Sequence, residues 1–373
     1  MKVLVVSDTH FHNWTQFSHI TKNGVNSRLE NDLEEFSRVC DEAQAEGCEG
    51  LIHCGDLFHV KGKIETSVLT SVLTRIETEV TKNFSYSMFL TGNHDIAFSD
   101  SYKWAGNSLM IGNWLAQRSV LAGMHSHTLP NDKSLGELCT ELEPFPRETL
   151  FLAWHKNIDE WKKAFSNFSY LKKIKFVFTH APIDGVVPGV PEGGITQDFL
   201  DSIGFKGKIF AGHYHNHKEV SPQLISVGAF AHHSWSDVGS KAGYLIVDTD
   251  SGDYEFRETK TPKFVDLDTI KVTSAEEYSA LCAGNYVRLT VEGELEKAKQ
   301  IQDEIKEVLG AKAVLVNLKA KKPETVRASA LGEITSNPLE KTISNYLDEV
   351  YKGHPLLEKI KGDALSLFST VGE

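Results

Sequence analysis

Short apolar runs alternate with amphipathic segments over the first 90 residues of the chain. The runs Lys2–Val6, Gly50–Cys54 and Ser87–Leu90 predict three strands. Between them, Leu29–Ala45 and Ser67–Val80 carry apolar residues at helical spacing and predict two helices. This alternation is typical of an α/β sheet, in which functional groups follow the ends of the strands.

The rest of the chain continues this pattern and then changes. Further strands are predicted at Ser119–Ala122, Leu150–Trp154, Lys175–Phe178, Lys208–Ala211, Leu224–Val227 and Gly243–Val247, with a helix at Asn157–Tyr170. After Thr261-Pro262, the segments Tyr286–Val291, Leu295–Leu309 and Ala313–Leu318 predict a compact strand–helix–strand unit. A Lys/Pro linker at Lys319–Thr325 precedes a final amphipathic helix, Asn337–Tyr351. We therefore expect three parts, residues 1–260, 261–320 and 321–373.

Composition narrows the class of protein. Of the 373 residues, 40% are hydrophobic and 24% are charged, as in ordinary globular proteins. No uncharged apolar run approaches the ~18 residues of a membrane span, and the apolar start of the chain is too short for a signal peptide. Five cysteines without a CxxC pair favour reduced thiols in the cytoplasm. The net charge of −12 argues against binding nucleic acid by bulk electrostatics alone, although bound metal could reverse the charge locally.

Polar residues follow five of the predicted strands. They are Asp8 and His10, Asp56, Asn93 and His94, His180, and His213 and His215. We expect them to meet at one edge of a sheet. Carboxylates and imidazoles together suit manganese, iron or zinc, and a carboxylate such as Asp56 can bridge two ions. Two ions ~3.5–4 Å apart can clamp a phosphoryl group and activate water.

Each of these motifs also has a simpler explanation. Asp8-x-His10 could be a cap or a turn, and Gly92-Asn93-His94 could be a turn, since Gly and Asn tolerate positive φ. His213 and His215 could be one buried and one exposed side chain of an extended segment. Five such segments, each following an apolar strand, together favour a metal site.

Taken together, these motifs resemble the calcineurin-like metallophosphoesterases. The resemblance rests on Asp8-x-His10, Gly55-Asp56, Gly92-Asn93-His94-Asp95, His180 and Gly212-His213-x-His215. It implies a four-layer α/β/β/α sandwich. It also implies two divalent ions, with manganese favoured and magnesium, iron or zinc as alternatives. One ion would be held by Asp8, His10, Asp56 and His215, and the other by Asp56, Asn93, His180 and His213. His94 would contact the phosphate and protonate the leaving oxygen.

The run Gly55-Asp56-Leu57-Phe58-His59 is similar to the SbcD nucleases and their meiotic-recombination relatives. In that branch, His59 would place the DNA phosphate for exonuclease action, and the alternative is an ordinary loop or helix-start histidine. One departure is the first motif, which lacks the usual Leu-Gly after His10 and reads Phe11-His12-Asn13. His12 is then either an extra phosphate contact or a surface histidine.

The later segments also resemble the SbcD family. Gly243–Asp248 and Thr261–Val265 look like the exit from its phosphoesterase domain, and the unit from about 285 to 320 looks like its small capping domain. The resemblance implies DNA as the substrate, a C-terminal helix that binds the coiled coil of an SbcC-type ATPase, and a homodimer. The apolar stripe of that helix, which includes Ile343 and Leu347, could instead pack on its own protein.

The sequence thus predicts a metal-dependent DNA exo/endonuclease subunit of an SbcCD-like complex. The alternatives are a small-molecule phosphodiesterase or phosphomonoesterase of the same superfamily, and a DNA-end scaffold with weak catalysis. No role follows from the sequence for His232 or His233.

Overall fold

Two units make up the chain, Met1–Ala320 and Lys321–Glu373. The structure is a computed structural model that describes residues 1–97, 107–110, 119–120, 148–168, 171–190, 193–270, 274–319, 338–354 and 356–371. No described helix is long and apolar enough to cross a membrane. The expected division at about residue 260 stays a prediction.

The first sheet has six strands in the order β11-β10-β1-β2-β3-β4. They are β1 (Lys2–Val6), β2 (Cys48–His53), β3 (Tyr86–Leu90), β4 (Ser119–Val120), β10 (Gly243–Asp248) and β11 (Tyr254–Glu258). The first four run parallel, and β10 pairs antiparallel with β1. The predicted strands are confirmed to within a few residues. The partly exposed edge strand β11 was not predicted, because it lacks an apolar run.

The second sheet has five strands in the order β5-β6-β7-β9-β8. They are β5 (Thr149–Leu152), β6 (Phe176–Thr179), β7 (Lys208–Ala211), β8 (Lys218–Ser221) and β9 (Leu224–Ser226). β5, β6, β7 and β9 run parallel. Only β8 was missed, because its residues are exposed or half-buried and carry no apolar pattern.

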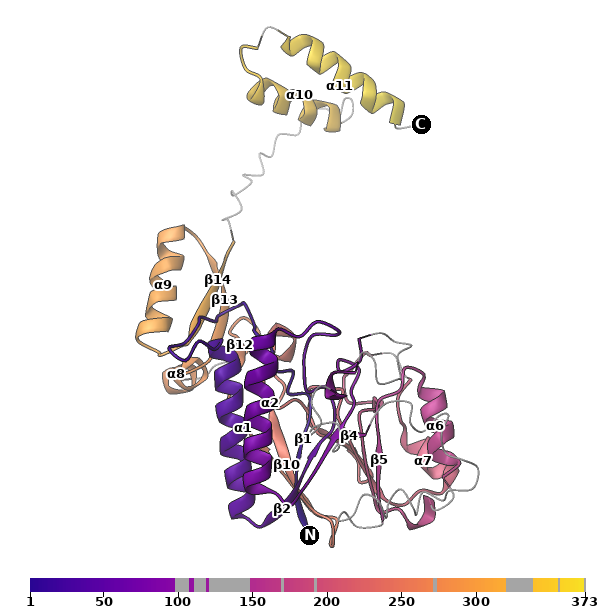
Figure 1. Ribbon diagram of the computed structural model, residues 1–373. Coiled ribbons are helices and arrows are strands. Elements are labelled where there is room, and N and C mark those ends of the chain that lie inside the picture. Colours follow the sequence, from indigo (N-terminus) through magenta and orange to yellow (C-terminus); the bar gives the residue numbers. More distant parts are fainter. Residues whose placement is uncertain are drawn as a thin grey trace. The chain divides into compact units, whose positions relative to one another are not determined.

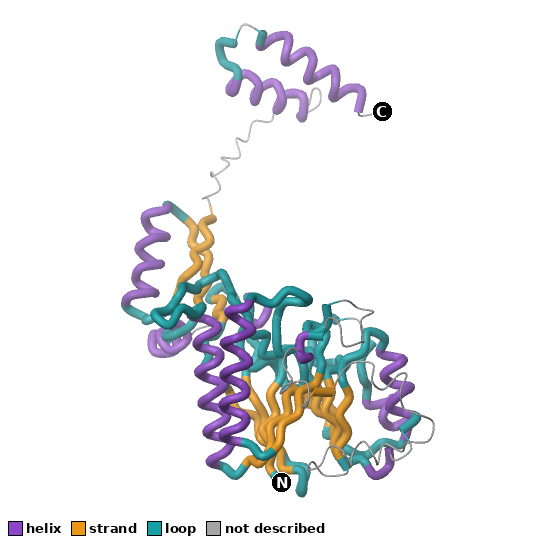
Figure 2. The backbone as a smooth tube through the Cα atoms, in the orientation of Figure 1, coloured by secondary structure: helices purple, strands orange, loops and turns teal. Residues whose placement is uncertain are grey.

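Alternation along β1 shows how the layers form. Val3 and Val5 lie in the cluster between the two sheets, whereas Leu4 and Val6 pack against helices on the outer face. Those helices are α1 (Ser27–Ala45) and α2 (Thr66–Asn83), while α6 (Ile158–Ser166) and α7 (Gln197–Ile203) cover the second sheet. Figures 1 and 2 show the strands between the two groups of helices. The expected four-layer α/β/β/α sandwich is confirmed.

This arrangement corrects one expectation about the site. The polar residues follow β1, β2 and β3 of the first sheet and β6 and β7 of the second, so two sheets contribute rather than one. Single-turn 3-10 helices occur at Ser108–Met110, Leu171–Lys173 and Trp235–Asp237. The predicted helix Asn157–Tyr170 is shorter, because α6 ends at Ser166, and residues 169–170 lie outside the described ones.

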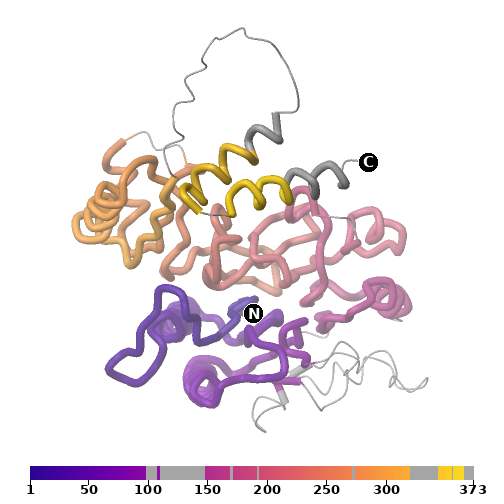
Figure 3. The backbone as a smooth tube through the Cα atoms, turned by 90° about the horizontal axis from the view of Figure 1, so that it is seen from above, coloured from indigo at the N-terminus to yellow at the C-terminus, as the bar shows by residue number. Residues whose placement is uncertain are grey.

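A second, smaller set of elements follows β11; we call residues 264–319 the small domain. It contains β12 (Phe264–Asp266), α8 (Ala275–Cys282), β13 (Tyr286–Glu292), α9 (Leu295–Glu307) and β14 (Ala313–Lys319). Its three parallel strands have their own apolar cluster, and Figure 3 shows the domain in orange. The predicted strand–helix–strand unit is confirmed, with β12 and α8 in addition.

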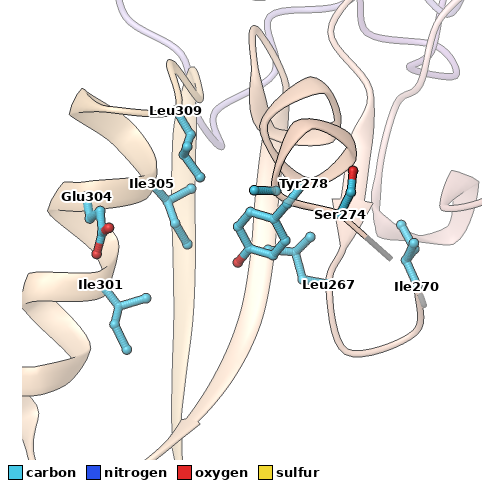
Figure 4. A pocket seen from close by; sticks show the side chains of 9 residues that line it. Leu267, Ile270, Ser274, Tyr278, Ile301, Glu304, Ile305 and Leu309 are labelled. Carbon is cyan, nitrogen blue, oxygen red and sulfur yellow. The ribbon is translucent and has the colours of Figure 1, made fainter. Parts of the chain in front are cut away.

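An open groove of about 740 Å³ lies in the small domain. Leu267 and Tyr278 line one side, and Ile301, Ile305 and Leu309 line the other (Figure 4). None of the polar residues that follow β1, β2, β3, β6 and β7 lines this groove.

The C-terminal unit is a helical hairpin of α10 (Pro338–Val350) and α11 (Leu357–Val371). The prediction of α10 as the final helix is wrong, because α11 follows it. The apolar stripe of α10 divides between two environments. Leu347 is buried, whereas Tyr346, Val350 and the following Tyr351 are 63%, 53% and 40% exposed. Residues 320–325 of the expected linker lie outside the described ones.

Candidate metal centre

Strained backbone marks four of the predicted ligands. Asp8, His10, Asp56 and His213 have φ values of 48°, 44°, 57° and 86°. Positive φ is uncommon for residues other than glycine, and such conformations cluster at functional sites. Each of these residues follows a strand directly or within four residues, so the turn that ends the strand also sets the direction of the side chain.

Glycines beside the ligands allow a close approach of the loops. A Cβ on Gly92 would lie 2.1 Å from Oδ1 of Asp56, and one on Gly55 would lie 2.3 Å from Nδ1 of His180. A Cβ on Gly212 would lie 2.1 Å from Oγ of Ser7. Side chains are therefore excluded at all three positions, which explains glycine in three of the motifs.

The second group of donor atoms surrounds Asn93. Nδ1 of His180 lies 2.7 Å from the carbonyl oxygen of Cys54, which can only accept, so Nδ1 carries the proton. In neutral His180 the lone pair of Nε2 then lies 3.3 Å from Oδ2 of Asp56 and 3.2 Å from Oδ1 of Asn93. Nδ1 of His213 lies 2.9 Å from the same Asn93 oxygen. A cation placed between these atoms would bind them together.

In the first group, too, histidine nitrogens and carboxylate oxygens come close together. Nδ1 of His215 lies 2.7 Å from Oδ1 of Asp237, which leaves the Nε2 lone pair facing Nε2 of His10 at 3.3 Å. Nε2 of His10 lies 3.6 Å from Oδ2 of Asp56 and 3.9 Å from Oδ1 of Asp8. That Asp8 oxygen is buried and has no hydrogen-bond partner. An unsatisfied buried carboxylate oxygen is costly unless a cation binds it.

The spacing within both groups fits metal binding. Ligand atoms ~2.0–2.2 Å from one ion lie roughly 3.0–3.5 Å apart in tetrahedral or octahedral geometry. The distances of 2.9 to 3.9 Å found here bracket that range. Asp8, His10, Asp56 and His215 would hold one ion, and Asp56, Asn93, His180 and His213 the other. When bound, two such ions polarise a phosphoryl group and activate water. The seven predicted ligands thus come together, and their role as ligands stays a prediction.

The pKa values of His180 and Asp56 indicate that positive charge is favoured between them, whereas burial dominates the pKa values of Asp8 and His10. Burial would lower the pKa of His180, but Asp56 and Asp8 raise it to about 9. Burial opposes ionisation of Asp56, yet His180 and His10 hold its pKa below the usual range. Burial raises the pKa of Asp8 and lowers that of His10 well below its ordinary value. A proton on His180 therefore takes the place that a cation would fill.

His94 and His59 lie beside these donors. Nδ1 of His94 lies 2.5 Å from the carbonyl oxygen of His59, and the two rings stack with centroids 5.3 Å apart. The backbone N–H of His94 donates to Oδ1 of Asp56 at 2.7 Å. Burial and the neighbouring His94 lower the pKa of His59 to about 4, so its ring is neutral at pH 7. Both residues predicted for catalysis thus lie together, next to the shared carboxylate.

Three supporting residues were not assigned from the sequence. Asp95 accepts the backbone N–H groups of Asp56 and Gly92, each at 2.9 Å, and so fixes two motif turns. His233 lies with Nε2 2.9 Å from the Asp8 carbonyl oxygen, and its N–H donates to Asp237 at 2.7 Å. Asp95 is part of the Gly92-Asn93-His94-Asp95 motif, so a signal existed. Asp237 comes 22 residues after His215 and gives no local signal.

His12, the residue at the departure from the family motif, is half-buried. Its ring centroid lies 5.2 Å from Trp14 and 5.3 Å from His59. It therefore packs on aromatic rings near the site rather than lying on the open surface. Its contact with phosphate stays a prediction.

The four-layer fold brings the donors together at the ends of strands from both sheets, as a candidate metal site. The family model for calcineurin-like phosphoesterases matches residues 1–217, more than half of the chain, and the chain belongs to that family. No curated protein matches the chain.

Solved structures to which the chain is similar include a dimetal phosphatase from Danio rerio, with 10% identity over 69% of this chain and 96% of that one, at a TM-score of 0.40. A purple acid phosphatase from yellow lupin (Lupinus luteus) seeds has 14% identity over 69% of this chain, at a TM-score of 0.37, and the match spans 51% of the lupin chain. The nuclease MPE of Pseudomonas putida has 16% identity over 68% of this chain and 87% of that one, at a TM-score of 0.27.

Proposed function

We propose that the chain is a metal-dependent DNA nuclease, the SbcD-type subunit of a nuclease–ATPase complex. The observation that carries this proposal is the position of His59, stacked on His94 and adjacent to the two donor groups. A phosphodiester has one negative charge, whereas a terminal phosphate has up to two. The neutral His59 ring beside His94 can form a hydrogen bond to a phosphate without adding a positive charge. That suits a phosphodiester, which has only one negative charge to be balanced.

His94 is the proposed general acid. Its Nδ1 proton is committed to the His59 carbonyl oxygen, so in the cationic ring the transferable proton is on Nε2. Transfer of that proton to the leaving oxygen returns His94 to its neutral form. The hydrogen bond from its backbone N–H to Asp56 fixes the acid relative to the carboxylate shared by both donor groups.

Two cationic side chains near His59 support a polyanionic substrate. Lys61 and Lys63 are exposed on the loop that follows His59. Neither forms an ion pair with any residue that the structure describes. On a chain with a net charge of −12, such local cations can bind DNA phosphates, and the binding would weaken steeply as salt concentration rises.

The test compares substrates with Mn²⁺ present: duplex DNA, single-stranded DNA, bis(4-nitrophenyl) phosphate and 4-nitrophenyl phosphate. We expect His59→Ser to slow stepwise degradation of duplex ends while single-stranded DNA is still cleaved. His19→Ser, at an exposed histidine outside the site, is the matched control. Hydrolysis of the nitrophenyl diester without DNA cleavage would indicate a small-molecule phosphodiesterase. DNA binding without hydrolysis of any substrate would indicate a scaffold.

The exposed part of α10 is the proposed contact with the coiled coil of an SbcC-type ATPase. Tyr346 and Val350 are one helical turn apart and exposed, whereas Leu347 is buried. Charges at Leu347 would disrupt the hairpin itself, so the sharper variant is Tyr346→Glu with Val350→Glu. It should abolish association with the ATPase and leave nitrophenyl diester hydrolysis unchanged, while Lys352→Glu should change neither. Unfolding of the double variant at a much lower temperature would show that the stripe packs within this protein.

A further inference from the structure

Arg28 is a buried cation that lies between the candidate metal centre and the small domain. It is the second residue of α1, and only 4% of it is exposed. An arginine this deeply buried needs compensating partners. Its guanidinium donates to the carbonyl oxygens of His233 at 2.9 Å, His232 at 3.5 Å and Gln16 at 3.3 Å. These carbonyls belong to two loops that are far apart in the sequence.

Three aromatic rings surround the same guanidinium. Its central carbon lies 5.0 Å from the ring of Trp14, 5.1 Å from that of Phe264 and 5.3 Å from that of Tyr286. All three distances are within the ~6 Å over which a cation attracts an aromatic face. Phe264 begins β12 and Tyr286 begins β13, so one cation holds the small domain against the loop that carries Trp14. Figure 1 shows these strands beside the start of α1.

The partners of Arg28 in turn contact the site. The Trp14 ring centroid lies 4.4 Å from that of His59, and Trp14 stacks on His233 at 5.7 Å. His233 binds the Asp8 carbonyl oxygen through its ring and Asp237 through its backbone. Arg28 thus contacts His233 directly at its carbonyl oxygen and reaches His59 through Trp14. Among the described residues, it makes no hydrogen bond to the side chain of a predicted ligand.

We infer that Arg28 is a positioning residue through which the small domain sets the orientation of His59 and His233 beside the metal centre. The inference rests on the proposed function, because it explains how a domain added to the phosphoesterase acts on its site. The planar guanidinium is essential to it, since donation to several carbonyls within an aromatic enclosure needs a flat group with several N–H donors. Lysine can supply the charge but not this geometry.

The test compares Arg28→Met and Arg28→Lys with Arg75→Met. Arg75 is a suitable control because it is half-buried on α2 and likewise donates to a hydroxyl and a carbonyl, those of Ser37 and Leu33, which are not in the site. Each variant is assayed for metal content, thermal unfolding, and kcat and KM for bis(4-nitrophenyl) phosphate with Mn²⁺. Both Arg28 variants should keep two ions and lose about 10–100-fold in kcat, the usual effect of losing a supporting contact. Arg75→Met should keep the kcat of the parent protein.

Ring signals from ¹H–¹³C NMR of the Mg²⁺-loaded protein separate positioning from general destabilisation. The signals of His59 and His233, assigned from His59→Gln and His233→Gln, should shift in Arg28→Met and stay in place in Arg75→Met. Tyr286→Leu removes only the small-domain ring that packs on Arg28, and it should shift the same two signals. This second variant keeps the test valid if Arg28→Met does not fold. Unchanged kcat and unchanged ring signals in the Arg28 or Tyr286 variants would overturn the inference. If the parent protein hydrolyses the nitrophenyl diester but not DNA, the nuclease proposal fails while this test still decides the role of Arg28.

Discussion

The two donor groups of the metal centre differ in what holds their histidines. In the second group, His180 donates to the backbone carbonyl of Cys54, directly after the central strand β2. In the first group, His215 donates to the side chain of Asp237, which lies in the 3-10 helix Trp235–Asp237 outside both sheets. The second group is therefore supported by the scaffold itself, and the first by a side chain on a loop.

This difference has a physical consequence. A backbone carbonyl at the end of a buried strand cannot move without disturbing the sheet, whereas the loop with Asp237 is also bound by His233, whose carbonyl Arg28 holds. The geometry of the first group can thus be changed by single side chains, and the geometry of the second only by changing the backbone. A substitution of the carboxylate common to both groups should affect both. A substitution that shifts the backbone should affect the second group, and one that removes a supporting side chain should affect the first.

Asp56→Asn should have the largest effect, because Asp56 is the one predicted ligand common to both groups. Its Oδ2 lies 3.6 Å from Nε2 of His10 and 3.3 Å from Nε2 of His180. Removing the charge should abolish binding of both ions and hydrolysis of the nitrophenyl diester. Metal analysis after dialysis is the measurement, with the exposed Asp198→Asn as control. Two fully occupied ions in Asp56→Asn would show that the groups do not share this carboxylate.

His94→Ala tests the chemistry separately from either donor group. His94 contacts the shared carboxylate through its backbone N–H, which alanine retains. The variant should therefore keep both ions and lose ~10²–10⁴ in rate, as expected for removal of a general acid. Metal content and kcat are measured on the same preparation. Loss of an ion in His94→Ala would show that His94 is a metal ligand and belongs to one of the two donor groups.

Gly55→Ala should disturb the second group through the backbone. Gly55 has φ +102°, and a Cβ there would meet the His180 ring at 2.3 Å. Gly47 has φ +83° with no atom within 4 Å of its Cβ position, so Gly47→Ala is the matched control. Both should lower the free energy of unfolding by ~1–2 kcal/mol through the left-handed backbone. Only Gly55→Ala should also lose the second ion, as measured by metal titration. Equal metal binding in the two variants would show that the second group tolerates a shift of the backbone.

The sequence pointed to the residues that come together as predicted ligands, but not to the residues that support them. Asp8, Asp56 and His180 each follow an apolar strand, so periodicity located them. The parallel strands β1 and β2 bring Asp8 and Asp56 together, whereas His180 comes from the second sheet, which no local pattern indicated. Arg28 contacts His233 across 205 positions and Asp237 contacts His215 across 22, and such side-chain contacts leave no local pattern. The edge strand β8 was missed for a related reason, since its residues carry no apolar pattern. The helix α11 was missed although Leu357, Ile360 and Ala364 stand at helical spacing.

Asp237→Asn should have the smallest effect of the four and is the most specific test of the comparison. Burial opposes ionisation of Asp237, but its hydrogen bond with His215 holds its pKa below the usual range, so the carboxylate is charged at pH 7. Asparagine keeps the size of the side chain but removes the charge and leaves one acceptor oxygen. That oxygen cannot accept from both the His215 ring and the backbone N–H of His233, which bind different oxygens of Asp237. Affinity for the first ion should fall about 10–100-fold, the usual cost of losing a partner of a metal-binding histidine. The second ion should bind as before, because His180 depends on Cys54 instead. Calorimetric titration of the metal-free protein with Mn²⁺ resolves the two steps, and an equal fall in both affinities would mean that the two groups are supported as one unit.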